Sequence, residues 1–477
     1  MRIKVTILFL LAAFTGRAQS SDSVALSLGD VYTLAKVNHP IIKQARLQDD
    51  MAVAELLFTK GQFDPKIQSN YNVKNLNETE YYEKFNNTLK IPTWFPLDPK
   101  VEVYRNQGEH INPESYVSSS QDYWQVSAGV SLPIGKGLFI DERRMLVTQA
   151  QLFSGLAEVE KIKLINKTLL TISKSYWDWY LAYKKYELTA SAIEIAQEVL
   201  ARTNMDYEYG EAAVVDTIQA KITYQSRQTD FEKAKLELVQ SKLALSVHLW
   251  SDEGIPLELS NGTFPVAETS DFMVPTDSGF QRLVEWALSN HPDLRKLNTK
   301  REQLEVEQRW NRESLKPELN LSYSLIDAPF NNNGYETPDW DNNYKLGVDF
   351  SIPILLRKER GKLQKNRVYQ EQIEFEMTQT RLALSNQLKS IYAELKTNQI
   401  LAKQFSDMSR GYRLLFEAEV FNLESGESDL FKLNIQQEKY IGAQIKALEA
   451  LVKFEKMRYQ LPYEVGLPNL SYQELYE

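Results

Sequence analysis

The chain has 477 residues, no cysteine and a formal net charge of −9 at pH 7. Nucleic-acid binding normally needs a basic face, so an acidic chain without a basic stripe argues against a nucleic-acid partner. Without cysteine we expect neither disulfides nor a lipid anchor on cysteine, and this composition is compatible with an oxidising compartment.

Residues 1–18 are predicted to be a secretory signal peptide. Arg2 and Lys4 precede an apolar core at 5–14, and Gly16-Arg17-Ala18 is a small-x-small cleavage site. The apolar core is too short to span a bilayer as a helix, which makes an uncleaved membrane anchor the less favoured alternative. Cleavage would remove three basic residues and leave a still more acidic chain.

A helix-strand-strand-helix plan is predicted for the first structural repeat, residues 19–250. Asn38-His39-Pro40 separates two helical runs, because proline fits the first turn of a helix but not its interior. Two segments of alternating apolar and polar residues follow, a pattern typical of strands with one apolar and one wet face. The strands are predicted at about 65–73 and 123–132, and the long helices at 142–206 and 213–248.

Residues 74–122 form a long connection between these two predicted strands. Within it, the segments 93–96 and 100–104 are candidates for an extra hairpin beyond the main sheet. The sequence does not otherwise predict the structure of this connection.

The same plan is predicted again for the second repeat, residues 277–461, after an irregular connector at 251–276. Asn290-His291-Pro292 repeats the first Asn-His-Pro motif, and its distance to Pro317 equals the distance from the first motif to Pro65. This equal spacing indicates an internal duplication. Strands are predicted at about 317–325 and 343–352, long helices at 357–421 and 428–460, and a tail at 462–477.

The long helices carry apolar residues at alternating steps of three and four. This pattern runs from Ile162 to Leu200 in the first repeat and from Leu388 to Phe416 in the second. A sustained period of 3.5 residues is typical of long helices packed side by side as a coiled coil. We interpret these stripes as core packing, with no cofactor site.

The sequence contains no recognisable site for chemistry. We find no metal-ligand cluster, Gly-rich phosphate loop or nucleophile elbow. His39 and His291 occupy equivalent repeat positions, where helix capping or packing explains them best. We therefore expect no catalytic residue, no cofactor and no metal, and we do not expect an enzyme.

Four alternating strands per chain predict assembly with other copies. Membrane barrels begin at about eight strands, and open sheet edges expose unpaired backbone groups. Two copies reach only this lower limit, whereas three give twelve strands and one closed barrel. The apolar face would then meet outer-membrane lipid, with Trp124 and Tyr344 placed as an interfacial girdle. The residues predicted to face the lumen are Gln68, Asn70, Asn320, Ser322, Lys345 and Asp349.

These features together resemble the TolC-like outer-membrane efflux family over nearly all of the chain after residue 18. The resemblance rests on the duplicated Asn-His-Pro helix starts, the strand starts at Pro65 and Pro317, the strand ends at Pro133 and Pro353, and the glycine breaks at Gly210 and Gly426. No single motif is specific, but their duplicated order is.

The resemblance implies an α+β membrane protein built from a duplicated helix-strand-strand-helix unit. It implies a homotrimer with a 12-stranded outer-membrane β-barrel, four strands per subunit, continuous with a periplasmic α-helical coiled-coil barrel. It further implies docking to a periplasmic adaptor and an inner-membrane pump of a tripartite efflux or type I secretion system. Conduction would be passive, through the outer membrane of a Gram-negative cell, with a helical extension into the periplasm.

In that family the helix breaks lie at a periplasmic tip where the channel is gated. Asp216 matches an acidic position after Gly210, but Lys432 stands at the corresponding position of the second half, and Tyr207 matches a gate position in the opposite half. Ordinary solvated turn residues are the alternative interpretation. The candidate entrance residues are Tyr207, Gly210, Asp216, Glu424, Gly426, Glu427, Asp429 and Lys432.

Two other functions compete with a channel. A periplasmic coiled-coil adaptor or scaffold would usually show one helical hairpin between glycine-rich halves, whereas this chain has two full repeats. A periplasmic enzyme would need a convergent polar site that the sequence does not contain.

Overall fold

A computed structural model describes residues 24–119, 122–267, 274–327, 330–331, 334–335 and 342–470, without the side chains of 330–331, 334–335, Glu424 and Leu430. The predicted signal peptide and the last part of the predicted tail lie outside the described residues. The described chain forms two compact units that each combine segments of both repeats. The described residues of unit 1 lie within Met1–Ile42, Thr168–Pro275 and Ile391–Leu461. Those of unit 2 lie within Lys43–Lys167, Thr276–Ser390 and Pro462–Glu477.

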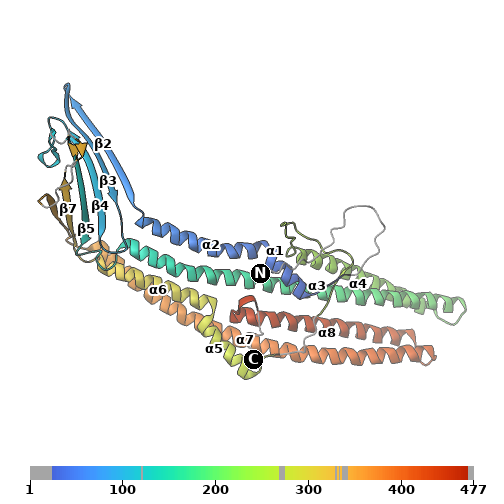
Figure 1. The fold of residues 1–477 in the computed structure, drawn as a ribbon. Coiled ribbons are helices and arrows are strands. Elements are labelled where there is room, and N and C mark those ends of the chain that lie inside the picture. The colour runs from blue at the N-terminus through green and yellow to red at the C-terminus, as the bar shows by residue number, and fades with distance from the viewer. Residues whose placement is uncertain are drawn as a thin grey trace, which may run out of the picture. The chain divides into compact units, whose positions relative to one another are not determined.

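Long helices make up most of the described chain (Figure 1). The helices are α1 (Leu28–Asn38), α2 (Pro40–Lys60), α3 (Glu142–Glu208), α4 (Val214–Ser246), α5 (Asp277–Asn290), α6 (Pro292–Glu313), α7 (Arg357–Glu424) and α8 (Leu430–Val465). Among the described residues, no helix combines the length and the apolar composition that a membrane span requires.

The strands are β1 (Val24–Leu26), β2 (Lys66–Leu76), β3 (Thr79–Lys90), β4 (Asp98–Gln107), β5 (Trp124–Pro133), β6 (Thr263–Pro265), β7 (Glu318–Asp327), β8 (Phe330–Asn331), β9 (Gly334–Tyr335) and β10 (Tyr344–Ser351). Short 3₁₀ turns lie at Gly61–Phe63, Pro113–Ser115 and Pro468–Leu470.

The two Asn-His-Pro motifs start helices in the same way. Pro40 and Pro292 are the first residues of α2 and α6. His39 Nδ1 accepts a hydrogen bond from the Ile41 amide at 3.2 Å, and His291 Nδ1 accepts one from the Asp293 amide at 3.2 Å. The prediction that these histidines cap helices is confirmed.

An aromatic cluster on α3 forms the core of unit 1. Tyr176, Trp177 and Trp179 are buried together with Leu28 and Val31 of α1. The Tyr176 hydroxyl lies 2.8 Å from the Leu26 carbonyl oxygen and accepts a hydrogen bond from the Val266 amide at 3.1 Å. It therefore ties α3 to the parallel pair β1 and β6, which places part of the predicted connector on the helical core.

The predicted apolar stripe of α3 is buried in its first half and displaced in its second. Leu169 and Ile172 are fully buried, as the 3.5-residue period predicts. Further along, Ala192 and Ala196 are the buried residues, whereas the stripe predicted Ile193 and Gln197. The buried face thus turns by one residue toward small side chains, which let neighbouring helices approach closely.

Unit 2 contains one antiparallel sheet of six strands in the order β10-β7-β5-β4-β3-β2. The prediction of four strands per chain is wrong, because β3 and β4 lie in the sheet between β2 and β5. The prediction of an extra hairpin beyond the sheet is wrong for the same reason. Residues 93–96 belong to the turn of this hairpin, and 100–104 belong to β4. Each strand of the hairpin has a strand of the main sheet to hydrogen-bond with, which a separate hairpin would lack.

The His39 ring makes unit 1 sensitive to acid. His39 is buried against His248, with Nε2 and Nδ1 of the two rings 3.1 Å apart. Burial, together with the neighbouring His248, lowers the pKa of His39 to about 4. The unfolded chain therefore binds a proton at this site near pH 6.5, well above the pH at which the folded chain does.

We expect this contribution to stability to be complete above about pH 6.5 and to be lost as the pH falls toward 4. Thermal unfolding followed by helical circular dichroism should show a smaller loss between pH 7 and 5 in His39→Asn than in the native chain. His110→Asn, which replaces the exposed His110, is the control and should keep the native loss. Equal pH dependence in native chain and His39→Asn would contradict this assignment.

Candidate functional site

The helix breaks at Gly210 and Gly426 have the same backbone geometry. Gly210 has a φ of +80° and Gly426 a φ of +77°, values that favour glycine over residues with a Cβ. The Gly210 amide donates to the Tyr207 carbonyl at 3.0 Å, and the Gly426 amide donates to the Leu423 carbonyl at 3.1 Å.

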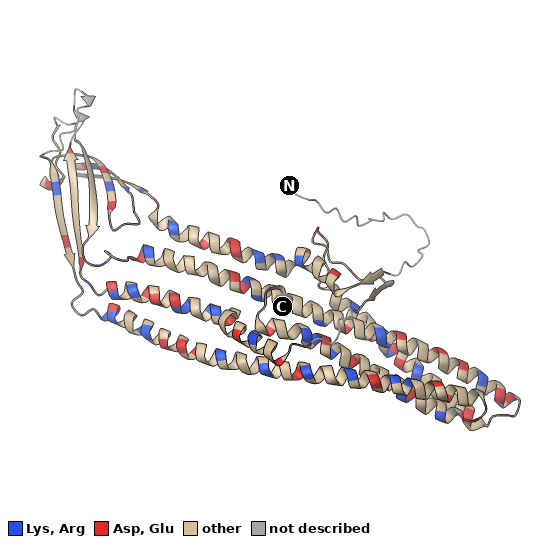
Figure 2. Ribbon diagram, turned by 60° about the horizontal axis from the view of Figure 1, so that its bottom comes forward, with Lys and Arg blue, Asp and Glu red and all other residues tan. Residues whose placement is uncertain are grey.

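The residue after each glycine completes the motif. The Glu211 amide donates to the Asp206 carbonyl at 2.8 Å, and the Glu427 amide donates to the Asn422 carbonyl at 2.9 Å. This pair of bonds is the Schellman ending of a helix, which satisfies carbonyl groups that the last turn leaves unpaired. Both turns lie at the same end of unit 1 (Figures 1 and 2).

Asp216 and Asp429 cap the helices that follow the breaks. The Asp216 carboxylate accepts a hydrogen bond from the Ala213 amide at 3.0 Å before α4. The Asp429 carboxylate accepts one from the Lys432 amide at 2.8 Å at the start of α8, and this bond lowers the pKa of Asp429. The two aspartates thus stand at different positions of the cap, which explains why they do not align between the repeats.

The structure brings only some of the predicted entrance residues together. Lys432 Nζ lies 3.5 Å from the Asp429 carboxylate, so these opposite charges compensate each other locally. Tyr207, Asp216 and Glu427 are exposed, whereas the side chain of Glu424 lies outside the described residues. Within the described part of the chain, no group of three or more histidine, aspartate or glutamate residues is arranged to hold a metal ion.

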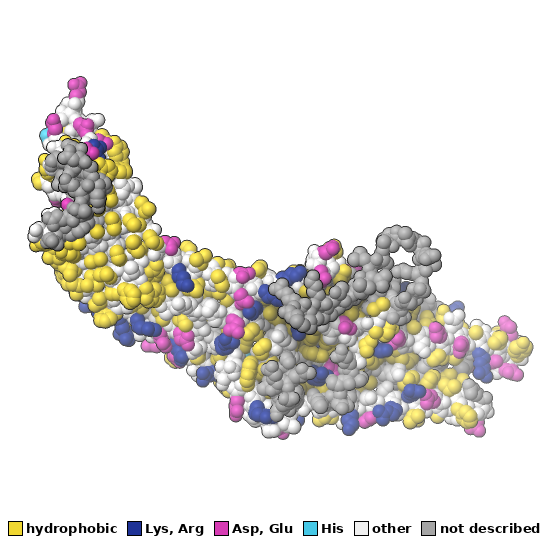
Figure 3. Space-filling view, viewed as in Figure 1, with side chains coloured by type: hydrophobic (Ala, Val, Ile, Leu, Met, Phe, Trp, Pro, Cys, Tyr) yellow, Lys and Arg dark blue, Asp and Glu magenta, His cyan; other side chains and the backbone are white. Residues whose placement is uncertain are grey.

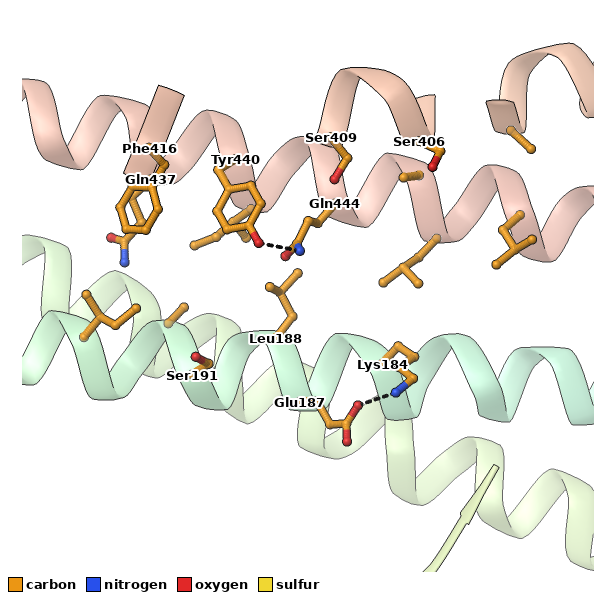
Figure 4. A pocket seen from close by; sticks show the side chains of 17 residues that line it. Lys184, Glu187, Leu188, Ser191, Ser406, Ser409, Phe416, Gln437, Tyr440 and Gln444 are labelled. Carbon is orange, nitrogen blue, oxygen red and sulfur yellow. Dashed lines mark hydrogen bonds and ion pairs between the residues drawn. The ribbon is translucent and has the colours of Figure 1, made fainter. Parts of the chain in front are cut away.

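A cleft of about 550 Å³ lies inside unit 1 between α3 and the pair α7 and α8 (Figure 4). Two pairs of its polar side chains contact each other, whereas Gln437 Nε2 and Gln444 Oε1 are buried without a hydrogen-bond partner. Lys184 Nζ contacts Glu187 at 2.7 Å, and Gln444 Nε2 donates to the Tyr440 hydroxyl at 2.7 Å. The sequence did not predict this cleft, because its walls come from both repeats. It brings together no nucleophile with a general base.

The polar face of the sheet contains all the residues predicted to face a lumen. Asp349 pairs with Asn320, and Ser322 pairs with Gly347, so β7 and β10 bring these residues together. Lys345 lies on the same face of β10, whereas Gln68 and Asn70 lie on β2 at the opposite edge.

The hairpin adds charged residues that the sequence analysis missed on this polar face. Lys66, Lys90 and Lys100 are consecutive partners across β2, β3 and β4. Like charges directly opposite each other are unfavourable in a sheet, and the Lys100 ammonium lies 3.3 Å from the Glu102 carboxylate. The only signal in the sequence is the lysines themselves, since their pairing depends on the position of the hairpin.

Solved structures with the same architecture exist, although no protein-family model matches the chain and no curated protein matches its sequence. The Campylobacter jejuni CmeC outer-membrane channel matches with a TM-score of 0.65 at 14% identity, over 92% of this chain and 85% of that one. The Vibrio cholerae outer-membrane protein VceC gives 0.63 at 11% identity, over 92% and 96%.

The open state of the Neisseria gonorrhoeae MtrE outer-membrane channel gives a TM-score of 0.59 at 14% identity, over 92% of this chain and 88% of that one. This chain has the outer-membrane channel fold. The resemblance inferred from the sequence is therefore confirmed at the level of the fold. Sequence identity this low carries no residue-level correspondence, so the entrance residues stand on their own geometry.

The capping role of Asp429 can be separated from its charge. Asp429→Asn keeps an oxygen that can accept the Lys432 amide, whereas Asp429→Ala removes it. We expect amide hydrogen exchange in the first turn of α8 to become several-fold faster in the alanine variant and to change little in the asparagine variant. Equal exchange in the two variants would show that the carboxylate does not cap the helix.

Proposed function

We propose that this chain is the outer-membrane channel subunit of a tripartite efflux or type I secretion system. Three copies would conduct substrates passively from a periplasmic adaptor and an inner-membrane pump to the exterior, without chemistry of their own. The observation that carries the proposal is the sheet of six strands, which has one mainly apolar face and one polar face. The outer-membrane channel fold supports the same function.

The apolar face of the sheet is built for contact with lipid. Val348 is 62% exposed and Phe350 is 65% exposed in the single chain, and Figure 3 shows hydrophobic side chains gathered over the strands. Monomeric soluble proteins rarely expose so continuous an apolar surface.

Aromatic side chains cross this apolar face in contact with one another. The ring centroids of Tyr71 and Phe85 are 6.4 Å apart, and those of Phe85 and Trp124 are 6.4 Å apart. Tyr323 and Tyr344 stack at 6.0 Å on the neighbouring strands. Barrels of the outer membrane carry such aromatic girdles where the hydrocarbon meets the head groups. This arrangement supports the predicted girdle position of Trp124 and Tyr344.

The helices also carry apolar surface that a single chain leaves uncovered. Leu236, Val239, Leu243 and Val247 of α4 and its C-terminal end are each at least half exposed and recur every three or four residues. Such spacing places them on one face of the helix. Packing against further copies of the chain would cover this face, which supports a homotrimer. The number three, the adaptor and the pump come from the resemblance to the TolC-like family.

The proposed location is the outer membrane of a Gram-negative cell, with the helices in the periplasm. The predicted signal peptide supports export, and the apolar face supports membrane insertion. A periplasmic adaptor or scaffold without a channel would have no need for a sheet with such a face.

Expression of the full chain with its signal peptide, followed by membrane fractionation, tests the proposal. We expect an oligomer in the outer-membrane fraction that conducts ions in a planar bilayer. A detergent-free soluble monomer without conductance would contradict the channel and favour the adaptor or scaffold.

Neighbouring residues of β7 provide matched variants for the same experiment. Leu321 lies on the apolar face and Asn320 on the polar face. A lysine facing the bilayer midplane costs roughly 2–4 kcal/mol, but costs little in a wet lumen. We expect Leu321→Lys to reduce the yield of membrane oligomer strongly and Asn320→Lys to leave it near the native level. Val348→Lys and Ser351→Lys repeat the comparison on β10, and equal yields within both pairs would contradict the assignment of the faces.

A further inference from the structure

We propose that the hairpin of β3 and β4 is part of the membrane wall, and that β10 of one copy pairs with β2 of the next copy. Each copy then contributes six strands, and three copies close a barrel of eighteen strands. This inference rests on the proposed channel function, because a wall is needed only if the sheet enters the membrane.

The hairpin is hydrogen-bonded to the sheet on both of its sides. β3 pairs with β2 from Lys66 opposite Lys90 to Leu76 opposite Thr79, with one irregularity between Lys74 and Asn75. β4 pairs with β5 from Asp98 opposite Ser131 to Arg105 opposite Trp124. No register joins β2 directly to β5 in the described sheet. Removing the hairpin from the sheet would therefore leave the facing edges of β2 and β5 unpaired.

The hairpin also continues both faces of the sheet. One row of paired residues crosses all six strands and is apolar or aromatic throughout: Ile67, Leu89, Val101, Ala128, Leu325 and Tyr344. The next row lies on the opposite face and contains Lys66, Lys90, Lys100, Gly129, Ser324 and Lys345. A slip by one residue anywhere would mix the two rows. Farther from the turn, Glu83 and Arg105 lie on the apolar face, in the rows of Val73 and Trp124. The hairpin sequence thus fits the same wall as the other four strands in the part next to its turn.

The turn of the hairpin is fixed beside the first turn of α3. Arg143 of α3 lies 3.3 Å from the Asp98 carboxylate at the start of β4. The Trp94 ring in the turn packs on the ring of Phe63, just before β2, with centroids 5.4 Å apart. The hairpin therefore extends along the sheet to the end where β2 starts and β5 leads into α3.

The polar face is crowded at one glycine of β5 and one glycine of β10. A Cβ on Gly129 would lie 2.1 Å from Ser324 Oγ, and a Cβ on Gly347 would lie 2.6 Å from Ser322 Oγ. At Gly129 the Tyr323 carbonyl oxygen would also lie 2.5 Å from that Cβ, so glycine is needed there. Glycine in a strand often marks a bend. Curvature toward the polar face is the direction that encloses a wet lumen.

The two edges of the sheet are complementary to each other. β2 and β10 each pair with one strand of the described sheet, so the outer edge of each carries unpaired backbone groups. Neighbours are antiparallel throughout, and the number of strands is even, so β2 and β10 run in opposite directions. β10 can thus pair with β2 of another copy in the same antiparallel sense, and this head-to-tail contact repeats until a ring closes.

The stagger of the strands agrees with a closed barrel. The apolar row begins at Ile67, the second residue of β2, and ends at Tyr344, the residue of β10 farthest from α7. The displacement is about one residue per strand, which tilts the strands by about 35° at ~3.3 Å per residue and ~4.8 Å between strands. Closed membrane barrels have tilts of roughly 35–45°.

The width of the pore follows from the number of strands. Barrel diameter grows roughly in proportion to strand number, and barrels of about 16–18 strands leave an aqueous channel. Six strands per copy therefore give a pore about half again as wide as four strands per copy would.

Cysteine pairs in the full chain test this arrangement, because the native sequence has no cysteine. In membranes that contain the oligomer, we expect oxidation to cross-link Val103→Cys with Val126→Cys within one chain, since these residues are partners between β4 and β5. Tyr71→Cys with Val126→Cys should not cross-link, because two strands separate them. A cross-link of Tyr71→Cys with Val126→Cys would overturn the proposal.

The contact between copies is tested with a cysteine at Phe350 of β10. Phe350→Cys is combined with Ile67→Cys or Ser69→Cys of β2, because all three residues lie on the apolar face. After oxidation, most chains should run as cross-linked dimers and trimers on a denaturing gel. Combined with Gln68→Cys on the opposite face, Phe350→Cys should link at least about tenfold fewer. Failure of both same-face pairs would overturn the proposed contact. Conductance of the cysteine-free chain reports separately on the proposed function, so the two failures are distinguishable.

Discussion

The unpaired backbone groups along β2 and β10 are the constraint on which the rest of the structure depends. Inside a bilayer each unsatisfied N–H or C=O group costs several kcal/mol, because no water is present to bind it. The large sheet described for one chain has six strands, too few to close a barrel. The sheet can therefore enter a membrane only with other copies of the chain, and its two antiparallel edges provide the means.

The helical part of the molecule meets a different requirement. Its core around Tyr176 and Trp179 is buried within a single chain, and the Tyr176 hydroxyl joins that core to β1 and β6. The apolar face of α4 is exposed in the single chain, and the proposed homotrimer would cover it. At each helix break, the helix before the glycine ends in a Schellman turn, and an aspartate caps the helix that follows. At the breaks, charge and helix capping reside in the same side chains.

Most helices could be predicted from the sequence because their signals are local. Pro40 and Pro292 fix helix starts, and Gly210 and Gly426 fix helix breaks, through the conformations that these residues favour or exclude. The strands β2, β5, β7 and β10 follow from clean alternation. β3 was missed because Asn86 and Asn87, and likewise Tyr81 and Tyr82, interrupt the alternation.

The candidate site was predicted less completely, since it depends on contacts between distant segments. The row of lysines across β2, β3 and β4 exists only when the hairpin is placed in the sheet. The cleft in unit 1 needs helices from both repeats. The capping role of Asp429 was within reach of the sequence, because Ser428-Asp429 stands at the start of a predicted helix, where aspartate is favoured. From the sequence, Asp429 was interpreted only as a candidate entrance residue, and its capping role was overlooked.

The most direct test of this account is a single-particle image reconstruction of the oligomer, extracted from the outer membrane into lipid nanodiscs, at a resolution that separates β-strands. The account predicts one closed barrel in which every copy contributes six strands and β10 of each copy lies beside β2 of the next. A barrel with four strands from each copy and the hairpin outside its wall would contradict it, as would a single chain with an open sheet.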